Sequence, residues 1–267
     1  MNTIFIIYKK LFCLLTGSNI SKIPGVRKVC AIINKKITPE TIEVFGNKIH
    51  IGNSGTVNFL HDTSDEIDFF KQHINRGEKI IDVGANIGWF SMIFAKIVGN
   101  EGKVFSFEPG KDNYSTLRKN ISINNFENIV SENVAVSDFN GELNLELSKT
   151  GNHKVSKKGT KTKCIKLDGY LKDEKIDFVK IDVEGHEYFV LMGMHNILKN
   201  NEKIKLKIEF NYKLIKKSGI KPENLLDFLI QNGFTLYDLR YERQMSKEEL
   251  IKEYSKIDGA TDIFCFK

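Results

Sequence analysis

A glycine-rich turn directly after an apolar segment is the first feature of the sequence that could bind a ligand. Residues 79–83 are largely apolar and lead into Gly84-Ala85-Asn86-Ile87-Gly88. Glycines at such a turn let the backbone approach a ligand, and free N–H groups collect where a helix begins. Glu108 ends the next apolar segment, where a carboxylate can accept hydrogen bonds from both hydroxyls of a ribose. Together these residues predict a nucleoside-binding turn.

The spacing of the glycines separates the nucleoside ligands that such a turn could bind. Dinucleotide sites carry the pattern GxGxxG and phosphate-binding loops carry GxxxxGK[ST], and the sequence contains neither. Here the pattern is GxxxG, and Asp82 precedes it. An acidic side chain repels a pyrophosphate but favours a ligand that carries an ammonium and a sulfonium group. The pattern therefore favours S-adenosylmethionine as cofactor, and the alternative is a strand-to-helix turn that needs glycine and binds nothing.

A second group of polar residues follows the apolar segment 176–181 and could take a proton from a reacting group. Asp182, Glu184 and His186 come directly after this segment, and Glu209 ends a later one. In an extended chain Asp182 and Glu184 point to the same side, and the ordinary pKa of histidine, about 6.5, suits a general base. These four residues are the predicted catalytic candidates.

Structural roles are the alternatives for the same residues. His186 could cap a helix or act as a hydrogen-bonded spacer. Glu184 could serve a helix N-terminus, where an anion contributes about 0.3–1 kcal/mol. Asp182, Glu184 and Glu209 could also bind Mg²⁺ through oxygen ligands. The sequence shows no dedicated metal-ligand spacing, so we expect no metal.

Alternating apolar and helical patterns predict the scaffold that positions these residues. Strands are expected at 79–83, 103–107, 129–136, 176–181, 204–210, 234–239 and 263–266, and helices at 89–98, 111–124, 187–198 and 222–232. A hairpin around Gly46-Asn47, a capped helix at 63–77, a hairpin at 141–147 and a charged helix before the last strand complete the prediction. Apolar strands that alternate with helices indicate an α/β fold with a parallel sheet covered on both faces. Ligands bind such sheets at the carboxyl ends of the strands, where both groups of candidate residues lie.

Residues 1–40 differ from the rest of the chain in charge and in pattern. They contain seven basic residues and one acid, so the remaining 227 residues carry 33 basic and 33 acidic groups and are neutral. Two short apolar stripes at helical spacing predict a basic amphipathic helical arm, and neither reaches the ~18–20 residues that span a bilayer. Peripheral contact with the inner face of the membrane and a cap on the catalytic domain are the two open alternatives.

Composition excludes several classes of protein. With 41% hydrophobic residues, 28% charged residues and four prolines in 267, the chain is globular rather than disordered or fibrous. Its neutral main part argues against nucleic acid as a partner. The four cysteines, Cys13, Cys30, Cys164 and Cys265, form no CxxC pair, which predicts reduced thiols and a cytoplasmic location.

Four segments resemble, in order and in spacing, the FkbM family of S-adenosylmethionine-dependent methyltransferases. They are DVGANIGWFS from Asp82, VFSFEPGKDNYSTLRKNISINN from Val104, NVAVSDFNGEL from Asn133 and LDGYLKDEKIDFVKIDVEGHEYFVLMG from Leu167. The resemblance covers about residues 60–240. It implies a Rossmann-like class I methyltransferase fold with a seven-stranded, mostly parallel sheet and an antiparallel last strand. The N-terminal helical arm lies outside the match.

The resemblance also implies roles for individual residues. The first turn would hold the methionine end of the cofactor, Glu108 the ribose and residues 133–135 the adenine, with Asp182 beneath the transferred methyl group. The cofactor-binding residues expected in this way are Asp82, Gly84, Ala85, Asn86, Gly88, Trp89, Glu108, Asn133, Val134, Ala135 and Asp182.

Methyl transfer to a hydroxyl group is the function expected from these features. The acceptor would be a small molecule, a saccharide or a glycolipid, since members of the family with known chemistry methylate hydroxyl oxygens of macrolides and sugars. Residues 41–267 would form the methyltransferase domain. The alternatives are a methyltransferase that acts on RNA or protein, which the neutral main part disfavours for RNA, and a non-catalytic nucleoside-binding module. The presence of Asp82, Glu108 and Asp182 disfavours the last of these.

Overall fold

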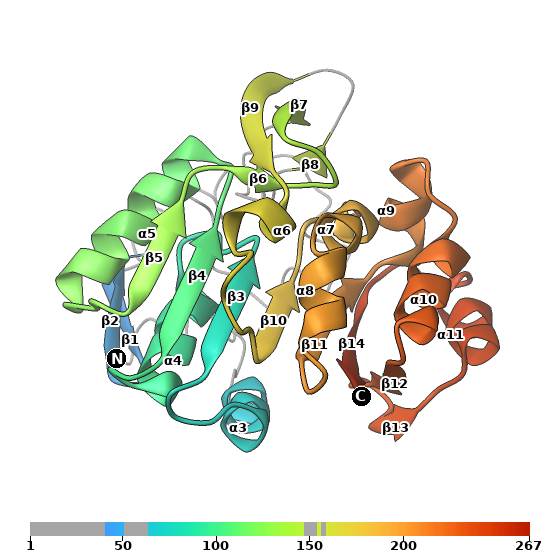
Figure 1. Ribbon diagram of the computed structural model, residues 1–267, viewed down its shortest axis with the longest axis horizontal. Coiled ribbons are helices and arrows are strands. Elements are labelled where there is room, and N and C mark those ends of the chain that lie inside the picture. The colour runs from blue at the N-terminus through green and yellow to red at the C-terminus, as the bar shows by residue number, and fades with distance from the viewer. Residues whose placement is uncertain (1–40, 51–63, 147–153, 156–158) are drawn as a thin grey trace, which may run out of the picture.

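The computed structural model describes residues 41–50, 64–146, 154–155 and 159–267 (Figure 1). The predicted arm, residues 1–40, and with it Cys13 and Cys30, lie outside the described residues. The described chain begins with an antiparallel hairpin of β1 (Thr41–Val44) and β2 (Asn47–His50). Its turn consists of Phe45 and Gly46, which both have a positive φ. The turn therefore lies one residue before the predicted Gly46-Asn47.

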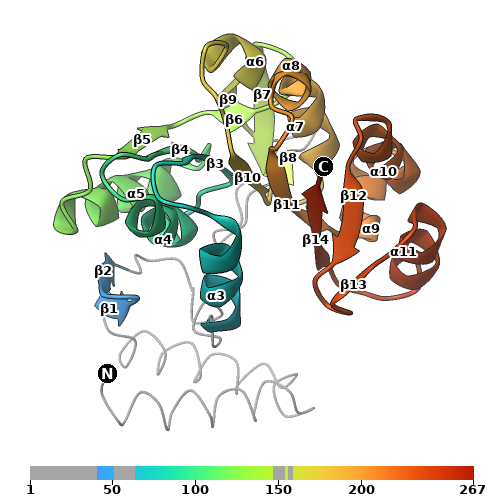
Figure 2. The same ribbon diagram turned by 60° about the horizontal axis from the view of Figure 1, so that its bottom comes forward.

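A mostly parallel sheet forms the centre of the fold (Figures 1 and 2). Its strands are β3 (Lys79–Val83), β4 (Lys103–Phe107), β5 (Ile129–Glu132), β10 (Phe178–Ile181), β11 (Lys205–Phe210), β12 (Thr235–Asp238), β13 (Arg243–Gln244) and β14 (Thr261–Phe266). The order is β13-β12-β14-β11-β10-β3-β4-β5, and β14 runs antiparallel to both β11 and β12. The predicted seven strands with an antiparallel last strand are confirmed, and the short β13 extends one edge.

Helices cover both faces of this sheet (Figure 2). One face carries α3 (Ser64–His73), α4 (Trp89–Val98) and α5 (Lys111–Ile123), and the other carries α7 (Glu187–Gly193), α8 (His195–Asn200) and α10 (Pro222–Gln231). Three more helices are α6 (Leu167–Tyr170), α9 (Tyr212–Lys217) and α11 (Lys247–Tyr254). Because side chains alternate along a strand, Ile80 packs in the cluster with α3, α4 and α5, and Ile81 in the cluster with α7, α8 and α10.

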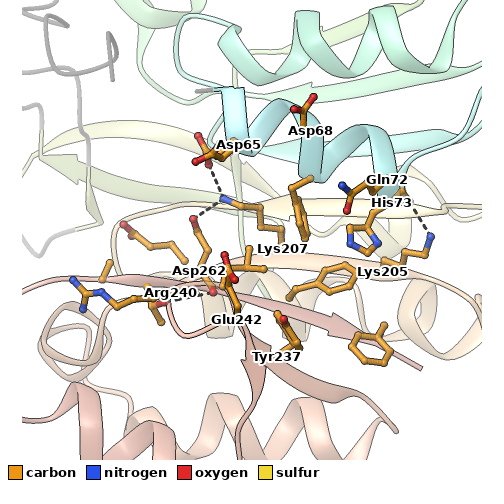
Figure 3. Close-up of a pocket in the computed structure, with 18 of the residues that line it drawn as sticks. Asp65, Asp68, Gln72, His73, Lys205, Lys207, Tyr237, Arg240, Glu242 and Asp262 are labelled. Carbon is orange, nitrogen blue, oxygen red and sulfur yellow. Dashed lines mark hydrogen bonds and ion pairs between the residues drawn. The ribbon is translucent and has the colours of Figure 1, made fainter. Parts of the chain in front are cut away.

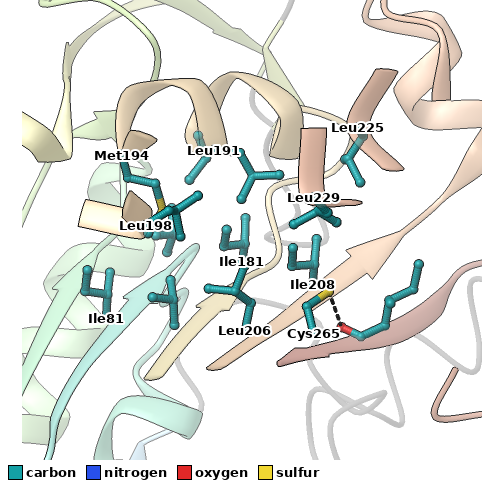
Figure 4. Close-up of a cluster of buried hydrophobic side chains, with 14 of the residues drawn as sticks. Ile81, Ile181, Leu191, Met194, Leu198, Leu206, Ile208, Leu225, Leu229 and Cys265 are labelled. Carbon is teal, nitrogen blue, oxygen red and sulfur yellow. Dashed lines mark hydrogen bonds between the residues drawn. The ribbon is translucent and has the colours of Figure 1, made fainter. Parts of the chain in front are cut away.

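The two faces of the central strands differ in their chemistry. The face under α7, α8 and α10 is apolar and includes Ile181, Leu206 and Ile208, which pack against Leu191 and Leu229 (Figure 4). The opposite face contains two buried lysines, Lys180 and Lys207, which are 3% and 4% exposed. Burying an ammonium group costs several kcal/mol unless it is paired.

A second sheet lies beyond the carboxyl ends of β4 and β5 (Figure 1). It consists of β6 (Ala135–Val136), β7 (Gly141–Glu146), β8 (Lys154–Val155) and β9 (Thr160–Ile165), in the order β6-β9-β7-β8. The prediction of one strand over 129–136 is therefore wrong, since β5 and β6 belong to different sheets. Asn133 separates them, because its Nδ2 donates to the carbonyl oxygens of Glu108 at 2.8 Å and Pro109 at 3.1 Å.

The predicted helix over 187–198 is also divided. It ends at Gly193, and α8 begins at His195. A Cβ atom on Gly193 would lie 2.0 Å from the carbonyl oxygen of Ser137, so the backbone packs directly on the end of β6 here. Among the described helices, none is long and apolar enough to cross a membrane. Cys164 and Cys265 are buried and free.

Candidate active site

A cavity of about 260 Å³ lies at the carboxyl ends of β3, β4, β10 and β11. Ligands bind at this edge in doubly covered parallel sheets. The predicted site residues that line it are Gly84, Ala85, Asn86, Trp89, Glu108, Val134, Ala135, Asp182, Glu184, His186 and Glu209. The structure therefore brings the predicted cofactor residues and the predicted catalytic residues to one cavity. Asp82, Gly88 and Asn133 lie outside its wall.

The two glycines of the first turn serve different contacts. Gly84 has a φ of 79°, and a Cβ atom there would lie 1.9 Å from the carbonyl oxygen of Asp182. Its small size thus lets the end of β3 approach the end of β10. Gly88, with a φ of 88°, precedes α4, and a Cβ atom there would lie 2.4 Å from Leu117 Cδ1 on α5. Gly84 shapes the cavity, whereas Gly88 lets two helices pack.

Glu108 is fixed in the cavity wall by backbone donors. Its Oε2 accepts a hydrogen bond from the N–H of Asn86 at 2.8 Å, and its Oε1 accepts one from the N–H of Gly110 at 2.8 Å. The residue is 4% exposed, and this burial raises the pKa of Glu108 to about 7 although the donors act in the other direction. The side-chain Nδ2 of Asn113 also donates to Oε1, at a longer 3.5 Å. Since each carboxylate oxygen has two lone pairs, Oε2 can still accept a full hydrogen bond from a ligand hydroxyl.

Asp82 lies behind the wall rather than in it. Ser91 Oγ on α4 donates to its Oδ2 at 2.6 Å, and Lys180 Nζ lies 3.9 Å from its Oδ1. Burial raises the pKa of Asp82, and the charge of Lys180 opposes this effect. The expected position beside the charged end of the cofactor differs from the observed one, because Asp82 is still part of β3 and its side chain points under α4. Its connection to the cavity runs through Lys180, whose Nζ lies 3.2 Å from Asp182 Oδ2.

The segment after β10 turns sharply and brings carboxylates into the wall. The strand ends at Ile181, and Glu184 has a φ of 55°, so the predicted strand alternation does not extend from Asp182 to Glu184. The buried Glu187 holds the turn, because its Oε1 accepts hydrogen bonds from the N–H groups of Val183 at 3.2 Å and Gly185 at 3.0 Å. Burial raises the pKa of Glu187 to about 7.

His186 is buried in the segment between β10 and α7, beside the residue that follows β6. Its Nε2 lies 3.1 Å from Ser137 Oγ, and its ring stacks on Phe189 with 4.5 Å between the ring centroids. Burial lowers the pKa of His186 to about 4. The ring is therefore neutral at pH values near 7, and one of its nitrogens already has a partner. This geometry favours a positioning role over a role as general base.

Glu209, near the end of β11, carries the most isolated carboxyl group of the cavity. Its Oε2 is buried and forms no hydrogen bond with the part of the chain that the structure describes. Burial is the main cause that raises the pKa of Glu209 to about 9. Further increases come from the charges of Asp182, Glu187, Glu184 and Asp262. A positively charged ligand beside Glu209 would favour its ionised form.

Sequence reasoning gave no role to Lys180, Lys207 or Glu187. For Lys180 a signal was present, because it lies inside the otherwise apolar strand Phe178–Ile181, and a lysine is almost never fully buried unless it is paired. For Lys207 the pattern misleads, since β11 alternates charged and apolar residues as a half-exposed strand does. In the structure Lys207 Nζ pairs with Asp262 Oδ2 at 2.6 Å and with Glu66 Oε1 at 3.1 Å. For Glu187 the sequence offers no signal, because its partners are backbone N–H groups of a turn that only the fold defines.

The chemistry of the wall fits S-adenosylmethionine. Two sides of the cavity differ. Glu108 and the apolar Val134 and Ala135 lie toward β4. The carboxyl groups of Asp182, Glu184 and Glu209 lie toward β10 and β11. The first side suits a ribose and an adenine, and the second suits a sulfonium and an ammonium group but would repel a pyrophosphate. Within the described residues, no group of three or more His, Cys, Asp and Glu side chains is arranged to hold a metal ion.

Comparisons with known proteins give the same class of activity. The Methyltransferase FkbM domain matches residues 82–236, more than half of the 267 residues. A second family, protein-L-isoaspartate(D-aspartate) O-methyltransferase, matches residues 8–144 and overlaps it at the glycine turn and Glu108. Among solved structures, a putative rRNA-methylase from Clostridium thermocellum has a TM-score of 0.50 at 12% identity, covering 78% of this chain and 96% of that one. This likeness shows a common fold.

Curated relatives are methyltransferases as well. Hexuronic acid methyltransferase AglP from Haloferax volcanii is 29% identical over 177 residues, which are 64% of this chain and 69% of the relative. Protein-L-isoaspartate O-methyltransferase from Caenorhabditis elegans is 29% identical over 91 residues, which are 34% of this chain and 40% of the relative. The FkbM match covers residues 82–236. It therefore includes every described residue that lines the cavity, from Val83 to Glu209. The chain therefore belongs to the FkbM family of S-adenosylmethionine-dependent methyltransferases.

Proposed function

We propose that this protein transfers a methyl group from S-adenosylmethionine to a hydroxyl oxygen of a saccharide or a similar small molecule. The observation that supports it most is the cavity wall, which combines a fixed carboxyl group for a ribose, Glu108, with a carboxyl group for a proton, Glu209, whose Oε2 has no hydrogen-bond partner among the described residues. The similarity to a hexuronic acid methyltransferase supports a saccharide as the acceptor.

The wall residues have distinct proposed roles toward the cofactor. Glu108 accepts the ribose hydroxyls, and Val134 and Ala135 border the adenine. Asn86, whose Oδ1 is buried without a hydrogen-bond partner among the described residues, and Asp182 hold the methionine part. When bound, the cofactor supplies an electrophilic methyl carbon, whose bond to sulfur breaks as its bond to the acceptor oxygen forms.

The protein must align the acceptor hydroxyl and remove its proton. We propose that Glu209, rather than His186, takes the proton of the acceptor hydroxyl. A base is most effective when its pKa lies near the working pH, and a pKa of about 4 makes His186 a weak base. Glu209 becomes a stronger base than an exposed carboxylate once it is ionised, because its surroundings disfavour the charge. Asp182 lies beside it and borders the methyl group.

A turnover assay tests this proposal. The protein is incubated with S-adenosylmethionine and a panel of p-nitrophenyl glycosides of neutral hexoses and hexuronic acids, and products are identified by mass spectrometry. Mild alkali then separates the two kinds of oxygen, since it hydrolyses a methyl ester on a carboxyl group and leaves a methyl ether on a hydroxyl. An alkali-stable product that the Glu209→Gln variant does not form supports the proposal. Products that are only esters, or no product from any glycoside, contradict it.

A further inference from the structure

A second, larger cavity lies between α3 and the strands β11, β14 and β12 (Figure 3). Its volume is about 1310 Å³. On β11 it is lined by Lys205, Lys207 and Glu209, which share one face of the strand because side chains alternate. The cavity therefore lies on the charged face of the sheet, opposite the apolar face that packs under α7 and α10.

Glu209 joins this cavity to the cofactor cavity. In the described parts of the chain it is the one residue that lines both. The carboxyl group that we propose to take the acceptor proton thus stands between a small cavity, which fits the cofactor, and a large one without an assigned ligand. A methyl acceptor must reach the transferred carbon from the side away from the sulfur. The large cavity provides such an approach to Glu209.

Aromatic rings and polar groups together form the wall of the large cavity. Phe69 on α3 and Phe264 on β14 pack edge to face with 5.1 Å between their centroids, and Tyr237 on β12 lies beside Phe264 in the sheet. Figure 3 shows α3 along one side, with Tyr237 and Glu242 on the other. Apolar surface with a few polar groups is typical of sites for small ligands. A sugar ring suits this wall, because its C–H faces pack on aromatic rings and its hydroxyls both donate and accept hydrogen bonds.

The charges of the wall are balanced, which argues against a polyanion as ligand. Among the residues that the structure describes, six acidic and five basic side chains line the cavity. Two of the lysines are already occupied, since Lys205 Nζ donates to the carbonyl oxygen of His73 at 2.8 Å and Lys207 pairs with Asp262. A phosphate-rich ligand would meet too many carboxylates here. A ligand with many hydroxyl groups meets acceptors and donors in similar numbers.

We propose that this cavity binds the acceptor as a saccharide, with the reactive hydroxyl at Glu209 and the sugar ring on Tyr237. Arg240, which also lines the cavity, donates to ring hydroxyls or to the carboxylate of a hexuronic acid. The inference rests on the proposed function and adds the place where the acceptor binds.

Matched variants test the position of the acceptor. Tyr237→Ala and Arg240→Met change the cavity, and Tyr241→Ala and Arg243→Met change neighbouring residues outside both cavities. Each protein is assayed for the KM of the glycoside that the wild type methylates, for the affinity of S-adenosylhomocysteine by calorimetry, and for its melting temperature. Saturation-transfer NMR with p-nitrophenyl β-D-glucoside and β-D-glucuronide measures acceptor binding without turnover.

The expected result is specific to the acceptor. Tyr237→Ala should raise the acceptor KM about 10–30-fold, as the loss of a central aromatic contact does. Tyr237→Phe, which keeps the ring, should stay near the wild type, and both controls should leave KM unchanged. Affinity for S-adenosylhomocysteine should change by less than about twofold in every variant.

Other outcomes overturn the inference in distinguishable ways. If the wild type binds and methylates a glycoside but the cavity variants keep its KM, the acceptor binds elsewhere and the proposed function survives. If the cavity variants have a lower melting temperature but an unchanged KM, the varied side chains only stabilise the fold and the inference is wrong. If the wild type neither binds nor methylates any glycoside, the proposed function and the inference fail together.

Discussion

Binding of the sulfonium cofactor should release a proton from Glu209, and the Glu209→Gln variant should lose this release. In the protein without ligand, burial and the neighbouring carboxyl groups raise the pKa of Glu209 to about 9. At a pH of about 7.5, only about 3% of this carboxyl group is therefore ionised. A positive charge within ~4–6 Å lowers the pKa of a carboxyl group by about 1–3 pH units.

The size of the effect follows from these two values. With the cofactor bound, the pKa of Glu209 would lie at about 6–8, and the ionised fraction at a pH of about 7.5 would be roughly 25–95%. Binding should then release roughly 0.2–0.9 proton per protein. S-adenosylhomocysteine shares every group of the cofactor, its ammonium group included, except the methyl group and the sulfonium charge. It should release no proton from this residue.

Calorimetry in two buffers with different ionisation enthalpies, phosphate and Tris, measures the number of protons released. Burial raises the pKa of Glu108 and of Glu187 to about 7, so these groups can also lose protons. The ribose that we propose to face Glu108 is common to both ligands, so the contribution of Glu108 should cancel in the difference between them. The remaining difference in proton release between the cofactor and S-adenosylhomocysteine should be present in the wild type and close to zero in Glu209→Gln.

Two results would refute this reasoning. Equal proton release for the two ligands in the wild type would show that no carboxyl group responds to the sulfonium charge. A difference that persists in Glu209→Gln would assign the proton to another group, with Glu187 as the next candidate.

The pH dependence of stability gives a second check. The folded state keeps a proton on Glu209 that the unfolded state loses above its ordinary pKa of 4.5. The wild type therefore loses stability as the pH rises from 4.5 toward 9. Over this range, the melting temperature of Glu209→Gln should exceed that of the wild type by a growing margin.

Three further predictions concern the cofactor cavity. Glu108→Ala should weaken binding of S-adenosylhomocysteine about 10–150-fold by calorimetry, because charge-assisted hydrogen bonds to the ribose are lost, whereas Glu101→Ala, on the exposed surface, should not change it. Gly84→Ala should destabilise the protein by about 2–5 kcal/mol in urea unfolding, since the new Cβ meets the Asp182 carbonyl oxygen at a positive φ. Gly77→Ala has a similar φ and nothing within 4 Å, so it should cost only about 1–2 kcal/mol, and equal losses would refute the contact argument. His186→Gln should leave the shape of the pH–rate profile between about pH 6 and 9 unchanged, because the pKa of His186 is lowered to about 4; a profile that loses a step in this range would restore His186 as the base.

Local patterns in the sequence were sufficient to predict the central sheet and the edge at which ligands bind. Strands such as 79–83 and 103–107 are read from apolar runs, and their parallel order follows from the helices between them. Glu108 could be placed in the site because it ends a strand, and every parallel strand ends at the same edge. The four catalytic candidates reach the cavity for the same reason.

Contacts between distant segments limited the rest of the prediction. Asp82 was expected in the cavity, but whether a residue at the end of a strand faces a ligand or a helix depends on where the strand stops. The break between α7 and α8 depends on the close approach of Gly193 to Ser137, which lies far away in the sequence. The large cavity combines α3, β11, β12 and β14, and no single segment indicates it.

The pairing of the buried lysines explains why we expect Glu209 to be the carboxyl group that responds to a ligand. Lys180 lies between Asp82 and Asp182, and Lys207 lies between Glu66 and Asp262. Each lysine thus has two acidic partners, and among the described residues none forms an ion pair with Glu209. Among the described residues, this face of the sheet therefore holds more acidic than basic groups. The carboxyl group left without a basic partner is that of Glu209, near the end of β11. A positively charged ligand beside Glu209 would favour its ionised form, which the described residues do not pair with a cation. In the proposed mechanism the sulfonium of the cofactor supplies a positive charge beside Glu209 in the step that needs a base. The product has lost this charge, so the same electrostatic effect should favour its release.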